Sequence, residues 1–184
     1  MDMNYENIKK CCILSCGELY EEEEIEKKLF AFFNGIIKKG ITCFLFGEKT
    51  PFSMLCHEIL SYLRWAKYPF LSRYVYLMKG ECAFTEKDRE NFLTYNYYDL
   101  KEERTFYGFE KTVYKSSVSG EYFRNKLERS ENLVDDSAYC LTYYYQICKF
   151  GKERITEEEK IYKTAECYAY SGGKHVCDFS EKKI

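Results

Sequence analysis

The segment from residue 124 to residue 137 carries side chains that could bind an anion or a sugar. Arg129 is followed by Asp135 and then by Ser137. A guanidinium presents a planar fork of donors that fits a phosphate or a carboxylate, and the carboxylate of Asp135 could hold a ribose hydroxyl. Two structural alternatives stand beside these roles: Arg129 pairs with Asp135 on a helix surface, or Asp135 caps the entry to the strand that follows. The residue types leave both alternatives open.

Two glycines, each followed by a glutamate, come directly after apolar runs of the chain. Gly17 and Glu18 follow the run from 10 to 16, and Gly47 and Glu48 follow the run from 41 to 46. Open α/β sheets bind ligands beyond the carboxyl ends of their strands, where the strand order switches. We therefore expect one cleft at that edge. Its predicted borders are Gly17, Glu18, Gly47, Glu48, Arg129, Asp135, Ser137 and Tyr144.

Tyr144 enters this set because of the unusual aromatic content. Aromatic residues make up 18% of the chain, with 19 tyrosines and 14 phenylalanines, more than the inward faces of the helices need. In a strand Tyr143 and Tyr145 share one face and Tyr144 lies on the other. A tyrosine ring offers a rigid face for stacking on a base. Tyr144 is therefore a candidate ligand contact, and core packing is the alternative.

The motifs of common catalytic and nucleotide-binding families do not occur. The sequence has no Gly-x-Gly-x-x-Gly, no Walker A and no Gly-x-Ser-x-Gly, which argues against ordinary dehydrogenases, P-loop NTPases and serine hydrolases. Ten cysteines include no Cys-x-x-Cys, and only two histidines are present. We therefore predict reduced thiols that mostly fill core space, no metal and no cofactor, and we name no catalytic residue.

The composition predicts one folded domain spanning residues 1–184. Apolar residues make up 46% and charged residues 32% of 184 residues, which excludes a disordered chain. No apolar stretch approaches the ~20 residues of a membrane-spanning helix, so a membrane is not an expected partner. The net charge of -2 argues against nucleic acid as a partner. The first twenty residues lack a signal-peptide pattern, which predicts a cytoplasmic protein; a homo-oligomer is left open.

Short apolar runs alternate with longer amphipathic segments, the pattern of a parallel sheet with crossover helices. The sequence therefore predicts an α/β fold with helices on both faces of the sheet. Thr50-Pro51 and the pair Thr156 and Glu159 are start signals of helices. The expected strands are 10–16, 41–46, 74–78, 138–144 and 175–179, and the expected helices are 21–39, 51–66, 86–94, a segment from 119 onward, and 156–170.

One segment resembles a known superfamily. Residues 129–138 read Arg-Ser-Glu-Asn-Leu-Val-Asp-Asp-Ser-Ala and run into the apolar segment up to Tyr144. This order is similar to the Arg-Asn-x-x-Met-Val-Asp-x-Ser-Asp segment and buried strand of the SLOG superfamily, the Rossmann-like group of DprA/Smf and LOG proteins, and specifically to its small YpsA-like bacterial members. Arg124, which precedes Asn125, is the second candidate for the family's arginine. The resemblance implies a single Rossmann-like three-layer domain and a nucleotide or nucleotide-derived ligand.

The likeness is incomplete at the loops that bind the ligand in this superfamily. Gly17 stands where the family has Gly-His-Arg, without the histidine and the arginine. The family's Gly-Gly-Thr loop, which gives backbone N–H groups to a phosphate, corresponds in register to Ile161-Tyr162. We therefore expect a divergent, non-catalytic SLOG-like protein that binds a nucleotide-like metabolite in the strand-end cleft. The alternatives are a nucleoside monophosphate N-glycosidase of the LOG type, with Arg129 as its arginine, and a protein-interaction module without a small ligand.

Overall fold

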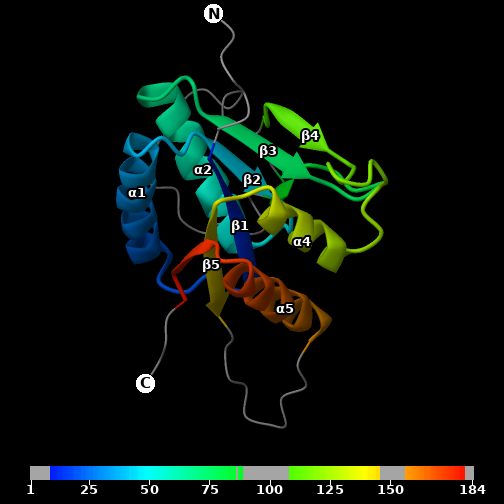
Figure 1. The fold of residues 1–184 in the computed structure, drawn as a ribbon. Coiled ribbons are helices and arrows are strands. Elements are labelled where there is room, and N and C mark those ends of the chain that lie inside the picture. Colours follow the sequence, from blue (N-terminus) through cyan, green and yellow to red (C-terminus); the bar gives the residue numbers. More distant parts are fainter. Residues whose placement is uncertain (1–8, 86, 89–107, 146–155, 181–184) are drawn as a thin grey trace, which may run out of the picture.

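The fold is a parallel sheet covered by helices on both faces (Figure 1). The computed structural model describes residues 9–85, 87–88, 108–145 and 156–180. Its six strands all run parallel, in the order β4-β3-β2-β1-β5-β6. The strands are β1 (Lys10–Gly17), β2 (Cys43–Phe46), β3 (Ser72–Tyr76), β4 (Lys111–Val113), β5 (Tyr139–Tyr145) and β6 (His175–Asp178).

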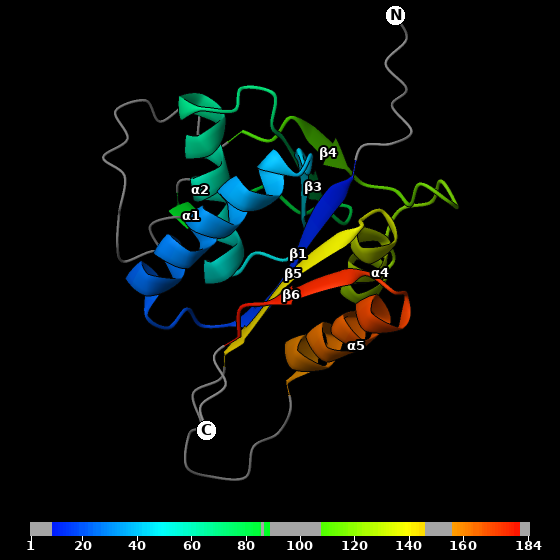
Figure 2. The ribbon, with the colours of Figure 1, turned by 60° about the vertical axis from the view of Figure 1, so that its left-hand side comes forward.

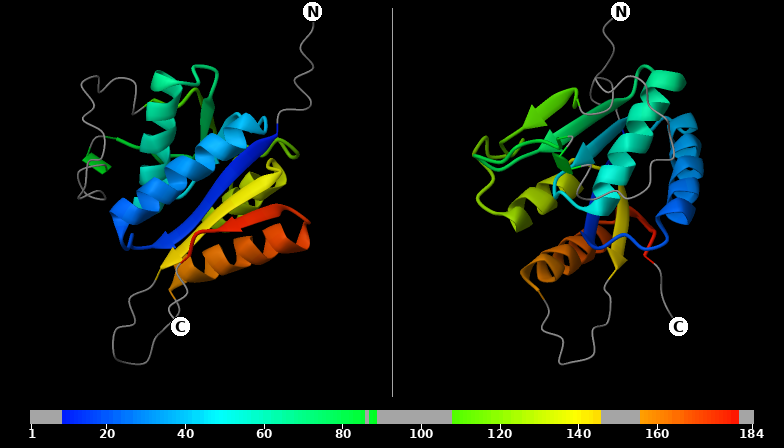
Figure 3. Two further views of the ribbon diagram at one scale, coloured as in Figure 1. Left: turned by 90° about the vertical axis from the view of Figure 1, so that its left-hand side faces the viewer. Right: turned by 180° about the vertical axis from the view of Figure 1, so that it is seen from behind.

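Four helices of the described residues form the outer two layers. They are α1 (Glu22–Lys38), α2 (Pro51–Ala66), α4 (Lys126–Asp135) and α5 (Glu157–Ser171). The left-hand view of Figure 3 shows α1 and α2 on one side of the sheet and α4 and α5 on the other. Each side has its own apolar core, because alternate side chains of the central strands point to opposite faces: Cys11 and Ile13 pack under α1 and α2, and Cys12 and Leu14 pack under α4 and α5.

The strand order switches direction between β1 and β5. The chain runs outward from β1 through β2 and β3 to β4, then crosses to β5 and β6 on the other side of β1. Figure 2 shows β5 and β6 following β1 on that side. The parallel register pairs Cys11 with Tyr139 at one end and Gly17 with Tyr145 at the other. The carboxyl ends of β1 and β5 therefore meet at the point where α/β proteins of this kind form crevices.

Three helices begin at this carboxyl edge with strong caps. The side chain of Thr50 accepts from the N–H of Ser53 at the start of α2, and that of Thr156 accepts from the N–H of Glu159 at the start of α5. Asn125 caps α4 by accepting from the N–H of Glu128. A capping side chain replaces the partner that a first-turn N–H lacks, so these residues determine where each helix begins.

The structure confirms the predicted α/β class, the parallel sheet and the three-layer, Rossmann-like arrangement. All five predicted strands are present, although β3 spans 72–76 instead of 74–78. The sixth strand, β4, has three residues and was not predicted. The predicted helix over 86–94 lies outside the described residues except for 87–88.

The helix expected from residue 119 begins later than predicted. Lys115 and Tyr122 form an antiparallel bridge, and Gly120 between them has a positive φ of 68°. This turn is incompatible with a helix, and α4 starts only after the cap at Asn125. The expectation was therefore wrong for Tyr122 and Phe123, which precede the helix.

Within the part of the chain that the structure describes, no helix has both the length and the apolar character that crossing a bilayer requires. The nine cysteines in the same part are free thiols, and six of them are buried.

Candidate functional site

A cavity of about 220 Å³ lies at the carboxyl edge of the sheet, beside the switch in strand order. It is formed by the end of β1, the loop between β2 and α2, and residues of α4 and α5. Its polar lining residues are Ser15, Glu48, Lys49, Thr50, Lys126, Ser130, Glu158 and Tyr162. Its other lining residues are Ile13, Leu14, Cys16, Gly17, Pro51, Leu133, Ile161 and Ala165.

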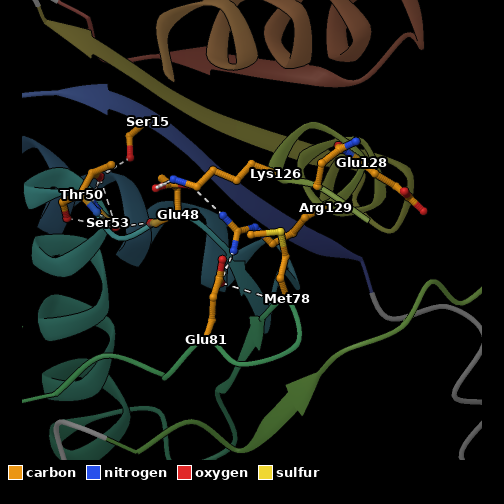
Figure 4. Close-up of polar contacts among 10 residues, drawn as sticks. Ser15, Glu48, Thr50, Ser53, Met78, Glu81, Lys126, Glu128 and Arg129 are labelled. Carbon is orange, nitrogen blue, oxygen red and sulfur yellow. Dashed lines mark hydrogen bonds and ion pairs between the residues drawn. The ribbon is translucent and has the colours of Figure 1, made fainter. Parts of the chain in front are cut away.

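Hydroxyl groups line the side of the cavity nearest to α2. Ser15 Oγ and Thr50 Oγ1 lie 2.5 Å apart and share a hydrogen bond (Figure 4). Thr50 and Ser53 cap each other: the N–H of Ser53 donates to Thr50 Oγ1 at 3.1 Å, and the N–H of Thr50 donates to Ser53 Oγ at 2.9 Å. These contacts fix the position of the Thr50 hydroxyl at the cavity wall.

A network of charged side chains links two loops and α4 at the cavity. Glu48 accepts from Lys126 Nζ at 3.0 Å through one oxygen and from Arg129 Nη2 at 2.7 Å through the other. The second end of the Arg129 guanidinium donates to Glu81 Oε2 at 2.5 Å. Figure 4 shows Arg129 between the two carboxylates. Arg129 therefore joins α4 to the loops that follow β2 and β3.

The guanidinium of Arg129 is almost completely buried. Its side chain is 2% exposed, whereas those of Glu48 and Glu81 are 33% and 29% exposed. A charge in such a position is stable only when it is paired and hydrogen-bonded. Both ends of the fork are engaged by carboxylates of the protein, and Arg129 is not among the lining residues of the cavity. Its role as an anion anchor stays a prediction and requires that at least one carboxylate release it.

Gly17 and Gly47 both lie where a side chain would collide with a neighbour. A Cβ on Gly17, which has a φ of +88°, would lie 1.8 Å from the carbonyl oxygen of Tyr145 in β5. A Cβ on Gly47 would lie 2.7 Å from Leu133 Cδ1 and 3.4 Å from Arg129 Nε. Gly17 thus permits close packing of β1 on β5, and Gly47 permits Arg129 to pack on the loop after β2.

The structure brings part of the predicted site together. Gly17 and Glu48 line the cavity. Gly47 directly precedes Glu48 in the chain, and Arg129 pairs with Glu48 outside the cavity lining. Glu18 is an exposed residue after Gly17. Arg124 precedes α4 with an 80% exposed side chain and pairs with Glu128 at 2.7 Å.

The expectation of a single cleft was wrong for Asp135 and Ser137. Asp135 is the last residue of α4, and Ser137 lies between α4 and the first residue of β5. This is the amino edge of the parallel sheet, opposite to the cavity. Asp135 accepts from the hydroxyl of Tyr168 at 2.6 Å, and the hydroxyl of Ser137 donates to the carbonyl of Leu133 at 2.6 Å. These contacts tie the end of α4 to α5 and terminate the helix.

Tyr144 packs against α5 near the cavity without lining it. Its ring stacks on the ring of Tyr162 at 5.5 Å, and Lys163 Nζ lies 5.6 Å from its centroid. Tyr143, on the other face, is buried and stacks on Phe52 at 4.4 Å. The alternation along the strand was therefore predicted correctly, but it is Tyr162 that contributes its side chain to the cavity.

Several lining residues were not predicted as site residues, although the sequence contains signals for them. Lys126 and Glu158 stand in the first turns of α4 and α5, directly after the caps Asn125 and Thr156. Helices that cross back over a parallel sheet begin at the carboxyl edge of the strands, so recognised caps place these first turns near the cleft. Ser130 follows one turn later on α4.

The thiol that lines the cavity is not activated as a nucleophile. Burial, together with the carboxylates of Glu159, Glu158 and Glu48, raises the pKa of Cys16 to about 11. Reactive cysteines are thiolates with a lowered pKa. Cys16 is therefore a protonated thiol at neutral pH, and burial contributes more to its raised pKa than the nearby carboxylates do.

Residues 9–85, 87–88, 108–145 and 156–180 contain no group of three or more histidine, cysteine, aspartate or glutamate side chains that could hold a metal ion. Comparison of the chain with protein-family models, with curated proteins and with solved structures found no match.

Proposed function

We propose that this protein is a divergent, non-catalytic member of the SLOG superfamily that binds a nucleotide or a nucleotide-derived ligand in the cavity at the carboxyl edge of its sheet. The observation that carries the proposal is the position of the cavity. It adjoins the end of β1 at the switch in strand order, which is where open α/β sheets bind nucleotides.

The size and lining of the cavity suit one part of such a ligand. Its volume of about 220 Å³ is below the ~300–1,000 Å³ of typical ligand sites, so a base or a ribose enters and the rest lies at the mouth. Hydroxyl and carboxylate groups supply acceptors for ribose hydroxyls. Apolar side chains such as Leu14, Leu133 and Ile161 supply contacts for a base.

Two features support a binding role over a catalytic one. Arg129, the arginine that the resemblance to the superfamily nominates, is engaged by Glu48 at 2.7 Å and by Glu81, so it is not available to a substrate. An N-glycosidase needs a carboxylate and an arginine that are available to its substrate. The Cys16 thiol is protonated at neutral pH because its pKa is raised to about 11 by burial and nearby carboxylates, which argues against covalent catalysis.

Isothermal titration calorimetry with adenosine, guanosine, cytidine, uridine and their 5′-monophosphates tests this proposal. We expect at least one of these compounds to bind with a Kd below about 1 mM, a free energy of about -4 kcal/mol. Ser130→Phe, which fills the cavity from α4, should abolish that binding. Glu131→Phe is the matched control, since Glu131 is the next residue of α4, is equally half-buried and does not line the cavity.

The outcomes separate the three functions. Binding that Ser130→Phe alone abolishes supports the proposal. Release of free base from a monophosphate, followed by chromatography, would make the protein an N-glycosidase. Absence of binding to the whole panel would refute the proposal and favour an interaction module without a small ligand.

A further inference from the structure

We propose that the cavity takes an uncharged, hydroxyl-rich group, the nucleoside part of its ligand, and discriminates against a phosphate. This inference rests on the proposed function and names the ligand class of the same site.

Among the described residues, each basic side chain that lines or adjoins the cavity is paired with a carboxylate of the protein. Lys126 pairs with Glu48 at 3.0 Å, and Lys49 pairs with Asp88 at 3.1 Å. Arg129 is held by both Glu48 and Glu81. A phosphate would have to displace a carboxylate to obtain any of these cations, and the displaced carboxylate would remain beside it.

Glu158 adds a negative charge that no cation of the described residues offsets. It lines the cavity from the first turn of α5, is exposed, and forms no ion pair among the described residues. In the described part of the chain, Lys49, Lys126 and Arg129 thus carry three positive charges in this network, and Glu48, Glu81, Asp88 and Glu158 carry four negative charges. The raised pKa of Cys16 has Glu158 and Glu48 among its causes, after burial and Glu159.

The helix N-termini at this edge, which often bind phosphates, are partly occupied by side chains of the protein. Side-chain caps at Thr50, Asn125 and Thr156 occupy first-turn N–H groups of α2, α4 and α5. Pro51 removes another donor from α2, because proline has no N–H. The first turn of α5 also carries Glu157, Glu158 and Glu159, which offset its positive dipole end.

What remains at the wall is a set of hydrogen-bonding groups suited to hydroxyls. Ser15, Thr50 and Ser130 each carry a hydroxyl that both donates and accepts, and the Glu158 carboxylate accepts only. A sugar hydroxyl donates to a carboxylate, whereas a phosphate oxygen is repelled by it. The lining therefore recognises a ribose and disfavours the dianion.

Calorimetry with a nucleoside and its 5′-monophosphate, on wild type, Glu158→Gln and Glu157→Gln at low ionic strength, tests the inference. In the wild type we expect the nucleoside to bind at least tenfold more tightly than the monophosphate. Glu158→Gln should reduce this ratio severalfold, because it removes the unpaired charge from the wall. Glu157→Gln is the matched control: Glu157 precedes Glu158 in the same turn and does not line the cavity, so the ratio should stay as in the wild type.

A monophosphate that binds the wild type as tightly as the nucleoside, or more tightly, overturns the inference and leaves the proposed function standing. An equal reduction of the ratio by Glu158→Gln and Glu157→Gln also overturns it, since the effect would then come from general charge. If neither compound of any nucleoside pair binds, the proposed function itself fails.

Discussion

Replacing Arg129 by methionine should destabilise the folded protein, because the substitution removes a buried guanidinium from its ion pairs. Methionine keeps the apolar part of the side chain and removes the guanidinium, which is 2% exposed and makes ion pairs of 2.7 Å and 2.5 Å with Glu48 and Glu81. Hydrogen bonds to charged groups contribute about 1.5–3 kcal/mol each. The two carboxylates are about one-third exposed and regain water, which offsets part of the loss. We expect the free energy of unfolding to fall by about 3 kcal/mol.

Urea unfolding followed by circular dichroism measures this loss. Arg124→Met is the matched control, because the Arg124 side chain is 80% exposed and pairs with Glu128 on the surface; its effect should stay within about 0.5 kcal/mol. If Arg129→Met changes the free energy of unfolding by less than about 1 kcal/mol, the network is not structural. Unchanged stability with weakened nucleoside binding would instead make Arg129 a ligand anchor.

Two further predictions concern the glycine at the end of β1 and a buried acid of α1. Gly17→Ala should lower the free energy of unfolding by more than about 3 kcal/mol, because the new Cβ would lie 1.8 Å from the Tyr145 carbonyl oxygen. Gly40→Ala, at a similar φ of +93° with no atom within 4 Å, should cost only about 1 kcal/mol, and equal losses for the two variants would contradict the packing argument. Burial and the nearby carboxylates of Glu22, Glu58 and Glu23 raise the pKa of Glu26 to about 7 from an ordinary 4.5. Between these two pH values the folded state keeps a proton on Glu26 that the unfolded state releases. The free energy of unfolding should therefore fall by up to about 3 kcal/mol as the pH rises from about 4.5 to about 7. Urea titrations at both pH values should show this fall largely lost in Glu26→Gln and only slightly reduced in Glu23→Gln, because Glu23 contributes least of the three carboxylates.

Local signals in the sequence were sufficient for most of the fold. Thr50-Pro51 and the pair Thr156 and Glu159 mark helix starts that the structure confirms as capping residues. The strand β4 was missed because three residues carry no usable periodicity, and its place beside β3 is set by long-range pairing. The start of α4 was misplaced because the apolar residues before Asn125 fit a helix as well as they fit the turn at Gly120.

The candidate site was only partly predictable, for a different reason. Gly17 and Glu48 were placed correctly because a loop after a strand of a parallel sheet must lie at the carboxyl edge. Glu48 precedes Arg129 by 81 residues, and Glu81 precedes it by 48 residues. The burial of Arg129 between these two carboxylates therefore leaves no local signature in the sequence. Asp135 and Ser137 were assigned to the cleft because they border a strand, whereas their position just before β5 places them at the opposite edge.

The most direct test of the central claim is a titration of ¹⁵N-labelled protein with the tightest-binding nucleoside of the panel, followed by amide chemical shifts. Binding in the cavity predicts the largest changes at Gly17, Thr50, Ser130 and Glu158, with no change at Asp135 or Ser137. The largest changes at the amino edge of the sheet, with the cavity amides unmoved, would contradict the account.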